Sequence, residues 1–61
     1  MKLKVTTLLE KIDTLWRIME HNGMMLCKSE VRCICDYAID KGYEYIHQIP
    51  DEEINEILST R

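Results

Sequence analysis

The side chains best suited to chemistry in this 61-residue chain are three cysteines and two histidines. In chain order they are His21, Cys27, Cys33, Cys35 and His47. Structural zinc sites place roughly two to four residues between paired cysteines, so that both thiolates reach one ion. Cys33 and Cys35 are only two positions apart in a predicted helix, where their side chains diverge by about 200°. We therefore expect no metal site, with Cys35 in the core and Cys33 at its margin.

Cysteine catalysis needs a base and surroundings that stabilise the thiolate. Cys27 is the best candidate, because it precedes a predicted helix and is followed by Lys28. The sequence shows no third residue that would orient a histidine, and the chain is short for a pocket. We therefore predict a protein without enzymatic activity, catalytic residues or a cofactor. A metal or redox module that uses Cys27, Cys33 and Cys35 remains an alternative.

The net charge of −3 is divided unevenly along the chain. Residues 1–32 carry six basic and four acidic side chains, whereas residues 33–61 carry two basic and seven acidic ones. Such an acidic half argues against binding to a phosphate backbone. It could instead steer a basic partner, or serve only to keep the protein soluble. A dimeric nucleic-acid-binding regulator resembling a helix-turn-helix protein is kept as an alternative.

Size and composition predict one small domain over residues 1–61. The chain is 46% hydrophobic, which is typical of a globular protein. Its odd number of cysteines does not form a closed disulfide framework, as expected in a reducing compartment. The longest apolar run, residues 24–27, is shorter than a signal peptide or a membrane helix needs. We therefore expect a cytoplasmic protein that does not enter the membrane.

Hydrophobic periodicity predicts three helices. The first spans residues 6–22 and ends at the sequence His21-Asn22-Gly23. Its buried stripe would consist of Val5, Leu8, Leu9, Ile12, Leu15, Trp16 and Met19, which recur with helical spacing. The second spans residues 30–41, between a Ser29 cap and Gly42. The third spans residues 50–59 and is opened by Pro50.

These elements predict an all-α fold, a compact three-helix bundle. Short strands are possible at residues 1–5, 24–27 or 43–49, and the last two could pair with each other. Residues 1–5 and 43–49 could equally be helical extensions.

Apolar side chains in excess of what a small core can bury suggest a binding surface. Ile18 lies off the main stripe of the first helix, and the other candidates lie in the two connections. The predicted interface consists of Ile18, Met24, Met25, Leu26, Tyr43 and Tyr45. Methionine and tyrosine are enriched at protein interfaces, although these residues could simply cap the core. The main hypothesis is a small, non-enzymatic interaction module or regulator that binds a protein partner, either a second copy in a homodimer or a foreign protein.

Overall fold

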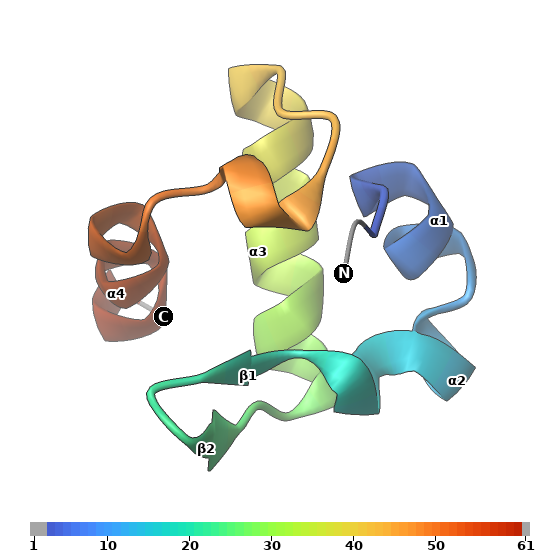
Figure 1. The fold of residues 1–61 in the computed structure, drawn as a ribbon, viewed down its shortest axis with the longest axis horizontal. Helices are drawn as coiled ribbons and strands as arrows, with labels where there is room; N and C mark the ends of the chain where they lie inside the picture. The colour runs from blue at the N-terminus through green and yellow to red at the C-terminus, as the bar shows by residue number, and fades with distance from the viewer. Residues whose placement is uncertain (1–2, 61) are drawn as a thin grey trace.

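The computed structural model describes residues 3–60, which form a mainly helical globule with a small hairpin (Figure 1). In chain order the elements are α1 (Val5–Glu10), α2 (Ile12–Leu15), the 3-10 helix η1 (Trp16–Ile18), β1 (Glu20–His21), β2 (Met24–Met25), α3 (Lys28–Lys41), the 3-10 helix η2 (Ile46–Gln48) and α4 (Asp51–Thr60). The longest helix, α3, stands in the centre, with α1 and α4 on opposite sides and the hairpin across one end (Figure 1).

The predicted second helix corresponds to α3, which begins two residues earlier than expected. Cys27, not Ser29, precedes it, and the Cys27 backbone N–H donates a hydrogen bond of 2.8 Å to Glu30 Oε1. This bond satisfies a backbone group that a helix start leaves without a partner. Four α3 residues are fully buried and form the centre of the core, namely Val31, Ile34, Cys35 and Ala38.

The end of α3 is confirmed at the predicted glycine. Gly42 has a φ of +84°, a left-handed conformation that glycine adopts without steric cost. The N–H of Tyr43 donates to the Ala38 carbonyl at 2.8 Å, and the N–H of Gly42 donates to the Ile39 carbonyl at 3.2 Å. These two bonds form a Schellman motif, which turns the chain away from the helix axis.

The prediction of one helix over residues 6–22 is wrong. The chain breaks at Lys11, where φ is −112° and ψ is +35°, and it becomes extended at Met19. A straight helix of this length would measure about 25 Å, as long as the whole molecule, whose largest extent is 24 Å. The break instead lets α1, α2 and η1 each contact α3. The apolar stripe is therefore wrapped around the core rather than laid along it.

Residues 24–27 contain a strand, but its partner is not residues 43–49. β2 pairs with β1 in an antiparallel ladder that sets Glu20 opposite Met25 and His21 opposite Met24. Asn22 and Gly23 connect them with φ values of +54° and +76°. Two left-handed residues in succession make the type of turn whose twist matches an antiparallel hairpin.

Residues 43–49 form η2 preceded by an extended connector. The connector makes one bridge with the N-terminal segment, between Lys4 and Tyr45. The N–H of Val5 donates to the Glu44 carbonyl, and the N–H of Ile46 donates to the Leu3 carbonyl, both at 2.9 Å. The predicted strand at 1–5 is therefore a single bridge, and residues 1–2 lie outside the described part of the chain.

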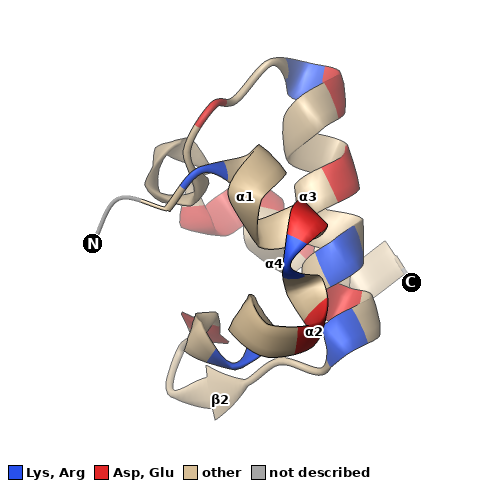
Figure 2. Ribbon diagram, turned by 90° about the vertical axis from the view of Figure 1, so that its right-hand side faces the viewer, with Lys and Arg blue, Asp and Glu red and all other residues tan. Residues whose placement is uncertain are grey.

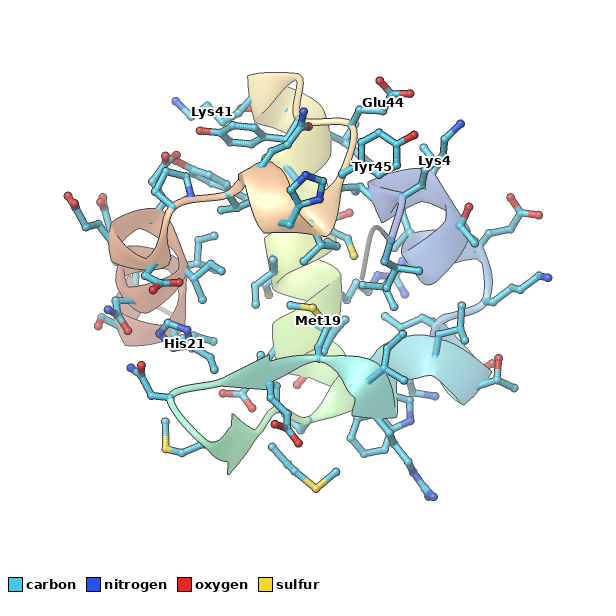
Figure 3. The ribbon with its side chains drawn as sticks, in the orientation of Figure 1. Lys4, Met19, His21, Lys41, Glu44 and Tyr45 are labelled. Atoms are coloured by element: carbon cyan, nitrogen blue, oxygen red, sulfur yellow. The ribbon has the colours of Figure 1, made fainter. Side chains whose placement is uncertain are left out.

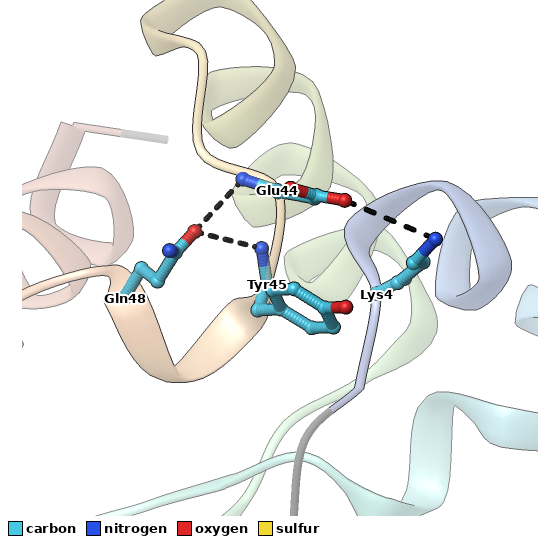
Figure 4. A network of polar contacts seen from close by, with 4 residues as sticks. All are labelled: Lys4, Glu44, Tyr45 and Gln48. Atoms are coloured by element: carbon cyan, nitrogen blue, oxygen red, sulfur yellow. Dashed lines mark hydrogen bonds and ion pairs between the residues drawn. The ribbon is translucent and has the colours of Figure 1, made fainter.

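A side-chain network holds this connector in place (Figure 4). The Gln48 side-chain oxygen accepts hydrogen bonds from the backbone N–H groups of Glu44 and Tyr45, at 2.9 and 3.0 Å. Glu44 Oε1 also lies 3.8 Å from the Lys4 ammonium. The Gln48 side chain, at the end of η2, thus accepts the backbone hydrogen bonds that a neighbouring strand would otherwise accept.

The predicted third helix is confirmed as α4, with a shift of one residue. The Pro50 carbonyl accepts the first helical bonds, from the N–H groups of Glu53 and Ile54. Ile54 is buried on the core, while Ile57 and Leu58 pack against it half-exposed. The fold is mostly helical as predicted, but a three-helix bundle is not confirmed, because four α-helices and a hairpin share residues 3–60. None of the described helices has both the length and the apolar character required to cross a bilayer.

Candidate partner-binding surface at the hairpin end

Three of the six predicted interface residues are exposed at the hairpin end of α3. Ile18 in η1 is 44% exposed, and Met24 and Met25 in β2 are 58% and 62% exposed. Ile18 lies two residues before β1, and the ladder pairs Met25 with the exposed Glu20 and Met24 with the buried His21, so the two methionine side chains leave opposite faces of the hairpin. We call Ile18, Met24 and Met25 the hairpin patch.

Leu26, the fourth predicted residue, belongs to the core and is only 2% exposed. Successive side chains of an extended segment point to opposite faces. With Met25 directed outward, the next residue is directed inward, onto the core. The same alternation buries Met19 and His21 while leaving Glu20 exposed. Buried side chains therefore lie within and directly before β1, and directly after β2.

Tyr43 and Tyr45 are half-buried and lie at the other end of α3. Figure 3 shows Tyr45 near the end of α3, where Lys41 is found, and His21 at the opposite end, by the hairpin. The structure therefore divides the predicted interface into two regions and does not bring the tyrosines to the methionines.

The Tyr43 hydroxyl is occupied within the protein. It donates a hydrogen bond of 2.8 Å to Glu53 Oε2, while the Tyr37 hydroxyl donates to Glu53 Oε1. These two bonds lower the pKa of the Glu53 carboxyl, and the bond from Tyr37 has the larger effect. In return, the bond to Glu53, followed by burial, raises the pKa of Tyr37 to about 12 and raises that of Tyr43. One carboxylate thus connects α3, the connector and α4, a role that the sequence did not reveal.

His21 connects the hairpin to α4. Its ring is 5% exposed, and Nε2 lies 2.6 Å from Asn55 Oδ1, an oxygen that can only accept a hydrogen bond. In the tautomer with the proton on Nε2, His21 donates to Asn55, and the Asn22 side-chain nitrogen lies 3.3 Å from the same ring nitrogen. The predicted first helix would end at this residue, and the structure instead places it in β1. Its partner is 34 residues away, beyond the reach of local patterns.

A hollow of about 340 Å³ lies between α2 and the start of α3, lined by Ile12, Asp13, Lys28, Ser29 and Arg32. The Lys28 ammonium donates a hydrogen bond to Asp13 Oδ1, and this contact lowers the pKa of the Asp13 carboxyl. Sequence reasoning missed the hollow, because α2 and α3 meet only after the predicted first helix is broken.

The cysteines do not converge on one point. Cys35 is buried, as predicted, whereas Cys27 and Cys33 are exposed, although Cys33 was expected at the margin of the core. Burial, with a contribution from the charge of Asp36, raises the pKa of the Cys35 thiol to about 11. Within residues 3–60, no group of three or more His, Cys, Asp or Glu side chains is arranged to hold a metal ion.

Comparison with known proteins gives no family for this chain. No family model matches it. Searches of curated proteins and of solved structures likewise found no significant match. Function is therefore argued from the surface alone.

Proposed function

We propose that this protein is a small, non-enzymatic protein-binding module that acts through the hairpin patch. The observation that carries the proposal is the grouping of exposed apolar side chains. Of the four large hydrophobic residues exposed in residues 3–60, three form the patch, and the fourth, Ile39, lies near the far end of α3. Methionine adapts its shape to a partner and is enriched in interface cores.

The surroundings of the patch also favour binding. Met19 and Leu26 are buried beneath it, and His21 bonds to Asn55 of α4. A surface held on a packed base loses little conformational entropy when a partner binds. The acidic C-terminal half, which contains α4, would orient the approaching partner.

Light scattering over a dilution series tests the proposal first. A concentration-dependent dimer that Met25→Glu abolishes would identify a second copy as the partner. A monomer at all concentrations would direct the search to a foreign protein. The immobilised parent protein would then be used to capture partners from the source cells, with the Met25→Glu variant as a parallel bait. Ile39→Glu is the matched control, since it alters another exposed apolar side chain, which lies outside the patch. The proposal fails if Met25→Glu retains every partner that the parent protein binds.

A further inference from the structure

We infer that the hairpin patch and the neighbouring hollow together bind an acidic, apolar peptide segment of a foreign protein. In this arrangement the apolar side chains of the segment cover Ile18 and Met25, on the face of the hairpin that carries Glu20, and its carboxylates bind Arg32 and Arg17. The inference rests on the proposed function and specifies the chemistry of the partner.

The patch and the hollow lie within reach of one short segment. Met25 and Lys28 are three positions apart, so their Cα atoms are separated by at most about 11 Å. Asp13, which lines the hollow, lies in α2, and η1, which ends at Ile18 of the patch, follows α2 directly. An extended segment of about six residues spans roughly 20 Å, which is enough to contact both regions.

The cations of this region differ in what they bind. Lys28 is paired with Asp13, so these two charges offset one another. Arg32 also lines the hollow, but it has no ion pair within residues 3–60. Arg17 likewise has no ion pair among the described residues, and its guanidinium lies 5.4 Å from the centre of the Trp16 ring. Guanidinium groups prefer carboxylates, which they can bind through two parallel hydrogen bonds.

Glu20 is the charge that opposes such a partner. It is exposed and faces Met25 across the ladder. A carboxylate next to Glu20 would be repelled, so the acidic residues of the segment must lie toward α2 and α3. This requirement sets the orientation of the partner on the patch.

The charge pattern of α3 favours a peptide over a nucleic acid. Lys28 and Arg32 lie with Glu30 in the first half of the helix, and Asp36 and Asp40 lie in the second half, which ends at Lys41 (Figure 2). A nucleic-acid backbone that followed this helix would pass from cations to anions. A short acidic segment can end before the anions, and it can also cover the exposed Met25.

Selection from a random peptide library displayed on phage, with the full chain immobilised, tests the inference. We expect enriched peptides that combine Asp or Glu with large apolar residues. One of them, made synthetically and labelled, is then titrated by fluorescence anisotropy. Arg32→Gln should weaken its binding about tenfold, as expected for loss of a charge-assisted hydrogen bond. Met25→Gln should also weaken it, Glu20→Gln should strengthen it about twofold, and Ile39→Gln should leave it unchanged.

Each other outcome overturns the inference in a different way. The enriched peptides could be neutral or basic, and their binding could depend on Met25 but not on Arg32. That result would support the proposed function and refute the acidic partner. Peptides that need Arg32 but not Met25 would refute the joint site. No enrichment over bare support would count against both proposals, unless the full chain proves to be a dimer through the patch. Tight binding of a labelled DNA duplex that competes with the peptide would assign the surface to nucleic acid.

Discussion

The two ends of α3 carry similar amphipathic residues but use them differently. At the connector end, the hydroxyls of Tyr37 and Tyr43 are both bonded to Glu53, and their rings are half-buried. At the hairpin end, Met24 and Met25 are more than half exposed, and a ladder of two residue pairs holds them. Residue type alone therefore does not identify an interface. What separates the two ends is whether another segment of the chain already covers the side chain.

The largest effect should come from Ile34, which serves both ends because it is buried in the middle of α3. We expect Ile34→Ala to lower the free energy of unfolding by about 2–5 kcal/mol, through lost burial and a cavity. Trp16→Ala should cost less, because the Trp16 ring at the hairpin end is only partly buried. Urea denaturation of both variants measures the difference. Equal losses would mean that the hairpin end is as densely packed as the centre.

Gly23→Ala tests how firmly the hairpin is built. The added Cβ meets no atom within 4 Å, so the cost arises from the φ of +76°. We expect a loss of about 1–2 kcal/mol, since alanine disfavours the left-handed conformation. The melting temperature measures this loss, and the matching change Gly42→Ala, at φ +84° with equal space, serves as its counterpart at the connector end. A negligible effect at Gly23 alone would show that the hairpin contributes little to stability.

The Glu53 network should make the connector end sensitive to pH. The Glu53 pKa is lowered on folding, so its stabilisation is present above the ordinary value of 4.5 and is lost as pH falls through the folded-state pKa. The Tyr37 pKa is raised from 10 to about 12, so that contribution is complete below pH 10 and is lost as pH rises toward 12. Denaturation midpoints across this range should fall at both extremes. Glu53→Gln should flatten both slopes, and unchanged slopes would contradict the network.

Thiol reactivity should distinguish surface from core without altering stability. The exposed Cys27 and Cys33 should be alkylated quickly by iodoacetamide near neutral pH. Cys35 should react slowly, since it is buried and its pKa is raised to about 11. Intact mass should therefore show two rapid additions and one slow addition, with three rapid additions in denaturant. Rapid modification of all three thiols in the native protein would place Cys35 outside the core.

Local signals in the sequence predicted α3 and α4 well. Gly42 supplies the left-handed residue that ends α3, and Pro50 opens α4. The stripe of Val31, Ile34, Cys35 and Ala38 has helical spacing and is fully buried. These features depend on neighbours within one or two turns, which is the range over which a sequence pattern is informative.

The N-terminal half was harder to predict, because tertiary contacts overrode the local pattern. The helical spacing from Val5 to Met19 is real, but the chain breaks at Lys11 and becomes extended at Met19. Thr6, Thr7 and Thr14 favour helix weakly, so little energy opposes the break. Asn22-Gly23 was interpreted as a helix stop, although the same dipeptide is a strong hairpin signal. The hollow and the link from His21 to Asn55 depend on how these segments meet in space.

The bridge between the N-terminal segment and the connector has a consequence for how the chain acquires its fold. Val5 and Ile46 complete their backbone bonds only with residues about 40 positions away in the sequence. During synthesis on a ribosome, α1 therefore emerges long before the segment that fixes it. Closing so long a loop carries an entropic cost that local helix formation does not. Residues 3–10 are thus made well before the connector that secures them, which follows α3 and the turn at Gly42.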